Sequence, residues 1–454
     1  MKRRDFMKAV GVSTLGAGMR SAAGEPQAGP DDAGSSHGEH EITWTRKVPV
    51  RYTADVAVIG GGIAGVSAAC AAAKSGARVI LVERFAVTGG MLTTGGVANF
   101  CGQMSGQGEV FDQIVSDLKR WHAIGYGKDT CFHYEILAII LQELLLNRKV
   151  KLLLHTRFVG VRVDDTGRID ECIVCGKSGI EAIRARQYID CTGDGDVARY
   201  AGFETVKGGP SGYQLPMSMM YFVRHVDQEH ATPHLPEGVF NPVRNEADLP
   251  MTSIWPDGPG SNAIKIKIPM FDSTDTESLT RAEIAARRRM MEVLDYYQRV
   301  ERDPWLLDHC SPIIGIREGS RIVGDYVLTV DDLRAGRAFD DGVARGTYYL
   351  DGHKPDDDKR TYILPKDELE VPPYQIPLRS LIAKDGTNLM MAGRCFSADQ
   401  LALSSARVST TGSMMGQAVG IAAALCVRHR CDPRDVEPGE VKRVVVARDG
   451  QLEV

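Results

Sequence analysis

Residues 55–83 read DVAVIGGGIAGVSAACAAAKSGARVILVE, and this stretch decides the fold. The apolar run from Asp55 to Gly60 is bounded by glycine, which is typical of a buried parallel strand. The alanine-rich run from Ile63 to Ser75 favours a helix, and Gly76 follows where glycine commonly ends one. Residues 78–83 form a second apolar run. The stretch therefore predicts a complete strand–helix–strand unit.

The glycines of this unit carry its chemistry. Gly60, Gly62 and Gly65 have the spacing G-x-G-x-x-G directly between the first strand and the helix. Such glycines allow a sharp turn and a close backbone approach to a diphosphate, which the helix N-terminus binds through its amides. Glu83 ends the second strand, where a carboxylate accepts hydrogen bonds from a ribose. The pattern predicts a dinucleotide site; the alternative is that these glycines serve only helix packing.

Two later segments favour FAD over NAD. Thr192–Asp196 (TGDGD) follows a predicted strand at 187–191, far along the chain from the first unit. A third strand, at 388–392, ends at Gly393 and Arg394, shortly before a small-residue helix expected from 410 to about 426. A simple nicotinamide dehydrogenase does not need these additional glycine-bearing loops beside the cofactor. Their order along the chain predicts FAD.

These segments resemble the broad family of FAD-dependent oxidoreductases that is distantly related to the flavoprotein subunits of fumarate reductase and succinate dehydrogenase. The resemblance implies that the loop from Thr88 to Gly96 lies along the diphosphate and isoalloxazine, and that the final helix points at the flavin. Cys191 departs from the family pattern, in which alanine is usual. The segment between about 205 and 310 resembles the family poorly. The matching stretches are 55–96, 189–198, 315–329 and 374–423.

The fold expected from these patterns is α/β. It combines a Rossmann-type FAD-binding domain, three-layered around a mostly parallel sheet, with an inserted mixed α+β domain that caps the substrate. The predicted parts are a leader at 1–30, a tether at 31–50, the first FAD-binding part at 51–200, the inserted domain at 201–370, the returning FAD-binding part at 371–430, and a tail at 431–454.

The leader resembles a twin-arginine export signal. Residues 2–8 read KRRDFMK, a weakly apolar run follows from Ala9 to Met19, and small residues at 21–23 suit a cleavage site. Residues 24–40 are rich in Gly, Pro, Ser and acidic residues, as in a solvated tether. We expect export of the folded, flavin-loaded protein to the periplasm or beyond. A disordered basic N-terminus is the alternative.

Composition and cysteine spacing exclude several classes of function. A net charge of −5 offers no general basic surface for nucleic acid, and residues 40–454 contain no unbroken apolar stretch that would span a bilayer. The ten cysteines have irregular spacing, which does not predict a disulfide scaffold, and no His/Cys cluster predicts a metal site. Cys172 and Cys175 would point to opposite faces of a strand. Cys101, near the flavin loop, is expected to be an inert buried thiol, with covalent flavin attachment or redox activity as alternatives.

The predicted cofactor-binding residues lie in these glycine-bearing loops and at the start of the last helix. The N-terminal amides of that helix would stabilise the negative charge that a reduced flavin gains at N1 and its C2 carbonyl. The set is Gly60, Gly62, Ile63, Ala64, Gly65, Glu83, Arg84, Gly90, Met91, Thr192, Gly193, Asp194, Gly393, Arg394, Gly412, Ser413 and Gly416.

The predicted catalytic residues are fewer. His353 is the expected base, because Asp351 lies two residues away and can orient it. Arg379 and Arg407 are candidate anchors for a polar or carboxylate substrate, since guanidinium groups bind carboxylates in bidentate fashion. Tyr374 completes the set. Other polar side chains considered for the same roles are His133 and Arg317.

The expected activity is dehydrogenation of a small polar substrate, a sugar, polyol or hydroxy acid, by hydride transfer to flavin N5. Electrons would then pass to an external acceptor. One alternative is reduction of an activated double bond, as in fumarate reductase, which would need carboxylate-binding groups from the 205–310 segment. Another is a flavin-binding module without turnover.

Replacing Glu83 by alanine tests the ribose role. The Glu83→Ala protein should lose FAD during purification, because the acceptor at the end of the second strand is gone. The flavin-to-protein absorbance ratio measures the loss, and a ratio equal to that of the wild type would contradict the role.

Overall fold

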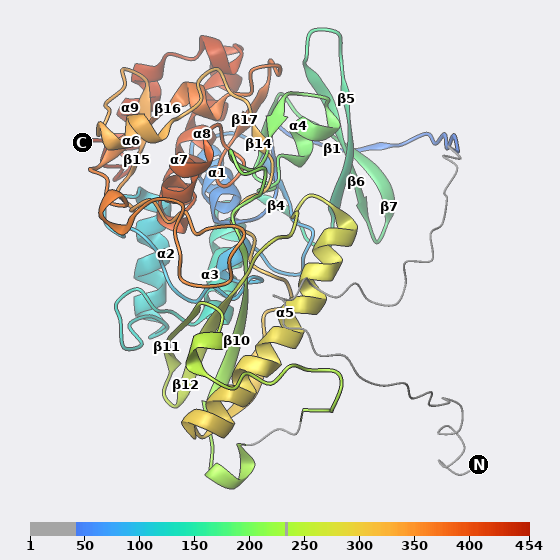
Figure 1. The fold of residues 1–454 in the computed structure, drawn as a ribbon. Coiled ribbons are helices and arrows are strands. Elements are labelled where there is room, and N and C mark those ends of the chain that lie inside the picture. The colour runs from blue at the N-terminus through green and yellow to red at the C-terminus, as the bar shows by residue number, and fades with distance from the viewer. Residues whose placement is uncertain (1–41, 232–234) are drawn as a thin grey trace. The chain divides into compact units, whose positions relative to one another are not determined.

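The computed structural model describes residues 42–231 and 235–454, so the predicted export signal lies outside the described residues. The chain divides into two units, 1–47 and 48–454. In the first unit, the described residues 42–47 contain neither helix nor strand. The elements of the second unit are shown in Figure 1.

A five-stranded parallel sheet forms the centre of this unit. The strand–helix–strand prediction is confirmed: two strands flank helix α1 (Ile63–Lys74) and pair in parallel. All four residues of each of these strands are buried, as expected for a parallel sheet covered on its faces. The strand order is β17-β8-β2-β3-β4. The bounds are β2 Val56–Ile59, β3 Val79–Val82, β4 Lys151–Leu153, β8 Gln187–Asp190 and β17 Leu389–Met391.

Helix α8 (Ser409–His429) packs on α1, and together they cover this sheet (Figure 1). Small residues allow the close approach: a Cβ placed on Gly416 or Gly420 would lie 2.1 or 2.2 Å from a carbonyl oxygen of α1. Helix α8 is long and apolar enough to cross a membrane, but 94% of its most apolar window is buried inside the protein. It is therefore a core helix of this fold.

A second, four-stranded sheet has the order β1-β7-β6-β5. Strands β5, β6 and β7 form an antiparallel meander, and β1 adds to β7 in parallel. Helices α2 and α3 contact α1. The bounds are β1 Val50–Thr53, β5 Arg157–Val163, β6 Ile169–Gly176, β7 Gly179–Arg184, α2 Glu109–Arg120, α3 Tyr134–Asn147 and α4 Asp196–Tyr200.

A four-stranded antiparallel sheet of order β11-β12-β10-β13 lies beside helix α5 (Thr276–Tyr296) in Figure 1. Alternation along β10 divides its side chains: Met219 and Tyr221 pack in a core shared with α5, whereas Met220 and Phe222 belong to the opposite face. That opposite face helps to line the cavity described below. The bounds are β10 Met217–His225, β11 Thr252–Gly258, β12 Ser261–Ile268 and β13 Trp305–Cys310.

Several of the remaining elements contribute buried residues to the core around the parallel sheet, which is called the first core. Two short pairs, β9 with β14 and β15 with β16, are antiparallel. The bounds are β9 Thr205–Val206, β14 Arg321–Ile322, β15 Gly342–Gly346, β16 Tyr374–Pro377, α6 Val330–Arg334, α7 Gln400–Ala406 and α9 Pro438–Val446. The short helical turns are η1 Gly90–Leu92, η2 Gln228–His230, η3 Glu246–Asp248, the π-type η4 Tyr297–Glu301, η5 Lys366–Glu368, η6 Leu378–Leu381 and η7 Pro433–Asp435.

Two predicted boundaries need correction. The separate antiparallel core occupies only residues 217–316 of the predicted 201–370 segment, and the later part of that segment, including Leu328 and Val343, packs into the first core. The predicted tail at 431–454 is not a tail. Its helix α9 packs on α8, and Val441 is fully buried, because the apolar face of α9 completes the main core.

Candidate functional site

One cavity collects most of the predicted residues. Its walls come from the carboxyl ends of the parallel strands, the inner face of the antiparallel sheet, the loop at 348–362 and the start of α8. The carboxyl end of a parallel sheet is where open α/β folds bind their ligands. The cavity has a nucleotide end, at the α1 N-terminus, and a second end where charged side chains of several elements meet.

In the glycine turn before α1, backbone atoms crowd Gly60 and Gly65 on one side, called below, whereas Gly62 faces open space on the other side, called above. Gly60 has a φ of +101°, and a Cβ there would lie 2.3 Å from the Cys191 carbonyl oxygen. A Cβ on Gly65 would lie 1.9 Å from the Gly60 carbonyl oxygen. A Cβ on Gly62, in contrast, would meet no atom within 4 Å, and Gly62 lines the cavity. The space above Gly62, at a helix N-terminus, fits the diphosphate of a dinucleotide.

Glu83 lies beside this turn with both carboxylate oxygens in use. Oε2 accepts the Gly61 N–H at 2.8 Å and Oε1 accepts the Phe85 N–H at 2.9 Å. Burial raises the pKa of Glu83. A carboxylate oxygen accepts more than one hydrogen bond, and the residue lines the cavity. The geometry is therefore compatible with ribose binding while also showing a structural role.

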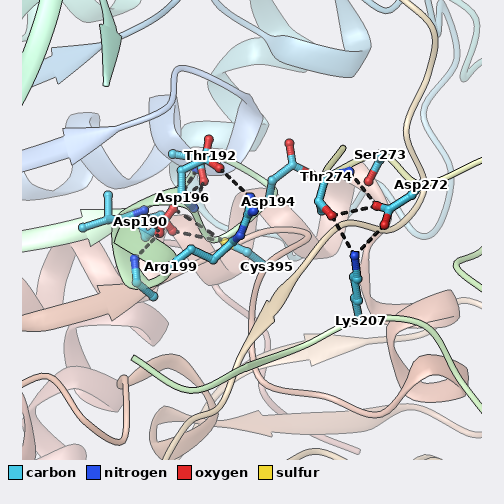
Figure 2. Close-up of polar contacts among 12 residues, drawn as sticks. Asp190, Thr192, Asp194, Asp196, Arg199, Lys207, Asp272, Ser273, Thr274 and Cys395 are labelled. Carbon is cyan, nitrogen blue, oxygen red and sulfur yellow. Dashed lines mark hydrogen bonds and ion pairs between the residues drawn. The ribbon is translucent and has the colours of Figure 1, made fainter. Parts of the chain in front are cut away.

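Asp190 organises the second predicted loop and was missed from the sequence. Its Oδ1 accepts from the Thr192 N–H at 3.0 Å and from the Thr192 hydroxyl at 2.7 Å, as Figure 2 shows. Its Oδ2 accepts the Val197 N–H at 2.9 Å. Burial raises the pKa of Asp190 to about 6. An acid at the end of β8, before the TGDGD loop, was the available signal. Nearby, Asp194 pairs with Arg394 at 2.7 Å.

The predicted cofactor-binding residues divide into two groups. Gly65, Asp194, Ser413 and Gly416 do not line the cavity. Gly65 and Gly416 make backbone contacts, and the Ser413 hydroxyl lies 2.7 Å from that of Ser67 in the α1–α8 interface. For Ser413 and Gly416 the cofactor contact is therefore wrong, because they face α1. The cavity is lined by Gly60, Gly62, Ile63, Ala64, Glu83, Arg84, Gly90, Met91, Thr192, Gly193, Gly393, Arg394 and Gly412.

Cationic side chains line the second end of the cavity. Arg407 pairs with Asp351 at 2.8 Å. The buried Arg317 donates to the Pro216 carbonyl oxygen at 2.6 Å. Within residues 42–231 and 235–454, neither Arg317 nor Lys265 has a carboxylate within salt-bridge distance, and Lys265 makes no side-chain hydrogen bond. The chain therefore places more positive than negative charge at this end.

The electrostatic consequences are seen in the pKa values. Burial, followed by the nearby Arg407, lowers the pKa of Arg317 to about 10. Burial, followed by Arg317, lowers the pKa of Lys265 to about 8. Burial alone would raise the pKa of Asp351, but its hydrogen bond with His353 and the charge of Arg407 hold it below the usual range. Because buried charges are stable only when compensated, this end of the cavity suits an anion.

His353 is held by protein groups on both sides of its ring. Nε2 lies 3.1 Å from Asp351 Oδ1, Nδ1 lies 3.4 Å from the Thr361 carbonyl oxygen, and the ring stacks on Tyr362 with centroids 4.7 Å apart. Burial lowers the pKa of His353. The expected partnership with Asp351 is present. The expected role as base changes, however, because both ring nitrogens face protein acceptors and neither is left for a substrate.

Two predicted catalytic residues lie away from the cavity. Tyr374 is fully buried in the main core, where its hydroxyl is 2.7 Å from that of Ser405. Arg379 has a side chain 52% exposed and forms a bidentate pair with Asp341, at 3.0 and 3.2 Å. Both predictions are wrong, since strand pairing turns Tyr374 inward to the core and the Asp341 carboxylate already occupies the Arg379 guanidinium.

Lys265 is the main residue that sequence reasoning missed. It belongs to the run IKIKI at 264–268, in which Lys265 and Lys267 alternate with isoleucines. Ile264 and Ile266 pack toward α5, so Lys265 must point to the opposite face and thus into the cavity. The alternation was visible in the sequence, but the cavity on its polar side was not.

The cysteines behave largely as expected. Cys101 lines the cavity, and burial raises the pKa of its thiol, which favours the unreactive protonated form. On β6, Cys172 is fully buried whereas Cys175 is partly exposed, in agreement with side chains on opposite faces. No group of three or more potential metal ligands occurs in the part of the chain that the structure describes.

Comparison with known proteins gives a family and a set of distant folds. The model of a family described as FAD dependent oxidoreductase matches residues 55–445. No curated protein matches the sequence. A geranylgeranyl bacteriochlorophyll reductase-like protein from Thermoplasma acidophilum is 12% identical, with a TM-score of 0.47, over 88% of this chain and 92% of that one. The anhydrotetracycline hydroxylase OxyS from Streptomyces rimosus is 14% identical, with a TM-score of 0.47, over 87% and 66%. The flavin-dependent brominase Bmp2 is 11% identical, with a TM-score of 0.43, over 86% and 83%.

Two glycine-to-alanine substitutions should separate the binding role of the turn from its packing role. Gly62→Ala adds a methyl group to open space at an ordinary φ of −63°, so the apoprotein should keep its thermal midpoint while FAD binds at least about tenfold more weakly. Gly65→Ala forces the methyl group against the Gly60 carbonyl and should lower the midpoint of the apoprotein itself.

Thermal unfolding of both apoproteins and FAD titration of each variant provide the measurements. Normal FAD affinity in Gly62→Ala would show that the space above this residue is not the diphosphate site.

Proposed function

The chain belongs to the family of FAD-dependent oxidoreductases, and we propose that this member dehydrogenates a small hydroxy acid. The observation that carries the substrate class is the cationic end of the cavity, where Lys265, Arg317 and Arg407 face a single nearby carboxylate, Asp351. Of the sugar, polyol and hydroxy acid classes expected from the sequence, only the hydroxy acid brings the negative charge that this arrangement lacks.

The nucleotide end fits FAD. The open space above Gly62, the N-terminus of α1 and the Glu83 carboxylate would hold the diphosphate and ribose. When bound, FAD supplies a two-electron acceptor for the substrate. The start of α8, with Gly412 lining the cavity, extends the cofactor wall toward the charged end. The more specific kinship with fumarate reductase remains a prediction, as does a capping role for the antiparallel part at 217–316.

Arg317 and Arg407 are the proposed carboxylate-binding pair. Among the described residues, Arg317 has a single protein acceptor, the Pro216 carbonyl, which leaves further N–H groups for a ligand. The Nε of Arg407 is buried and donates to no acceptor among the described residues. A substrate carboxylate beside the Arg317 and Arg407 side chains that line the cavity would accept hydrogen bonds from them and supply compensating charge.

Lys265 is the proposed base. With a pKa lowered to about 8, roughly a tenth of its amine is neutral at pH 7, and this neutral form is able to take a proton at Nζ. It lines the cavity and is not engaged by another described side chain. Asp351 and His353 position Arg407 rather than touching the substrate, because His353 holds one Asp351 oxygen and Arg407 holds the other.

Reduction of an activated double bond in an unsaturated acid is the second candidate, because the same cationic cluster would hold a substrate carboxylate. In that direction Lys265 would act as the protonated donor. The two activities differ in the redox direction that the bound flavin supports with substrate.

A panel of compounds should distinguish these activities. Under anaerobic conditions, small 2-hydroxy acids should bleach the flavin absorbance, whereas polyols of equal size without a carboxylate should not. Equal bleaching by neutral polyols would contradict the carboxylate site. Reoxidation of the chemically reduced protein by unsaturated acids, without bleaching by hydroxy acids, would favour the reductase instead.

Substitution of Lys265 tests the base. Because the neutral amine is the active form, kcat should rise with pH through about 8 in the wild type. Lys265→Met and Lys265→Arg should both lower kcat by about 10²–10⁴-fold while retaining FAD, since neither side chain accepts the proton. The pH profile of each variant provides the check. A Lys265→Arg protein with wild-type kcat and the same pH dependence would contradict the assignment.

A further inference from the structure

The C-terminal end of α8 brings two cysteines together. Arg430, directly after the helix, has a left-handed conformation with a φ of 57°, and the Cys431 N–H donates to the Cys426 carbonyl oxygen at 3.1 Å. A hydrogen bond spanning these positions across a left-handed residue is the Schellman ending of a helix. In this ending the side chains of the first and last residues frequently make contact. The backbone therefore brings Cys426 and Cys431 close together at the end of α8.

The thiols are free and differ in exposure. Cys426 is 1% exposed, and Cys431 is partly exposed. Burial raises the pKa of both thiols. The interaction between the two thiols further raises the pKa of Cys426 and partly offsets the rise at Cys431. The pair thus combines a solvent-accessible thiol with a buried partner on the same helix ending.

Sequence spacing alone did not predict this pairing. A disulfide needs close Cα atoms and side chains that point toward one another. Cys172 and Cys175 are closer along the chain, but the extended backbone of β6 directs them to opposite faces. At the end of α8, in contrast, the left-handed Arg430 turns the chain back on itself and brings the backbones of Cys426 and Cys431 close together.

We propose that Cys426 and Cys431 are a redox-reactive pair that forms a disulfide across the C-terminal end of α8 when the folded protein meets a disulfide oxidant. The predicted export route would carry the protein already folded. A thiol pair that is in contact in the native state is the kind that can still be oxidised after folding.

The reaction proceeds by thiol–disulfide exchange with a small disulfide such as oxidised glutathione. The Cys431 thiolate attacks one sulfur of the oxidant, which releases one glutathione thiolate and leaves a mixed disulfide on Cys431. The Cys426 thiolate then attacks the sulfur of Cys431 and releases the second glutathione thiolate. Two cysteine thiols lose two protons and two electrons, and one oxidised glutathione is reduced to two thiols.

The disulfide would act on the helix that covers the cofactor sheet. The N-terminal residues Ser409 and Gly412 of α8 line the cavity, and its middle packs on α1. A covalent closure at the opposite end prevents fraying of the last turn and restricts the unfolded chain. Oxidation should therefore raise the thermal midpoint without adding any group to the cavity.

The test uses the folded, FAD-loaded protein. Reduced protein is incubated with a series of glutathione redox buffers, quenched with acid, alkylated under denaturing conditions and digested with trypsin without reduction. Cleavage after Arg428 and Arg430 separates the two cysteines, so a disulfide-linked peptide pair that reductant splits identifies the bond. We expect this pair in the oxidising buffers, together with a higher thermal midpoint than in the reduced protein.

Two controls make the outcome decisive. The peptide that holds Cys172 and Cys175 should contain no internal disulfide, because those thiols point to opposite faces of β6 and cannot meet. Cys431→Ser should abolish both the linked peptides and the oxidant-dependent rise in the midpoint. If Cys431 instead accumulates as a glutathione mixed disulfide while Cys426 remains alkylated, the two thiols do not meet and the proposal is wrong.

Discussion

The contact between the glycine turn and helix α1 is the constraint on which the rest of the site depends. Below the turn, the Cys191 carbonyl oxygen lies against Gly60 and the Gly60 carbonyl oxygen lies against Gly65, so there is no room for a side chain at either glycine. Above it, Gly62 leaves a space bounded by backbone amides and a helix N-terminus. This asymmetry is what a diphosphate requires, because the anion needs both room and uncommitted N–H donors. The packing of α8 on α1 holds the helix in this position.

The charged end of the cavity has a different physical basis. Three cations from separate elements, Lys265 on β12, Arg317 in the loop before β14 and Arg407 after α7, meet near one carboxylate. Their burial, followed by their mutual repulsion, lowers the pKa values of Lys265 and Arg317. A protein accepts such a cost where a ligand supplies the missing charge. The same depression that signals an anion site also makes the Lys265 amine a usable base.

Local patterns were sufficient for the fold of the nucleotide end. The first strand, α1 and the second strand were found because apolar runs and glycine spacing are properties of adjacent residues, and the long helix α8 was found for the same reason. The family resemblance located the later loops. The bounds of the antiparallel part, 217–316, were not predicted. Its segment lacks the family's motifs, and its core is formed by contacts between the sheet and α5, which are distant in the sequence.

The catalytic end was predicted less well, since the direction of a side chain depends on distant partners. Tyr374 points into the core because β16 pairs with β15, and Arg379 is held by Asp341 from a separate loop. The small residues Ser413 and Gly416 were correctly seen as permitting close approach, but the group that approaches them is α1. Lys265 was overlooked because alternating lysines usually indicate a solvated face.

The small molecule released when the purified, folded protein is denatured tests the central claim most directly. Absorbance spectra and mass spectrometry of the filtrate should identify FAD, in an amount close to equimolar with the chain. A well-folded protein that binds no FAD when purified or when incubated with excess FAD would contradict the account.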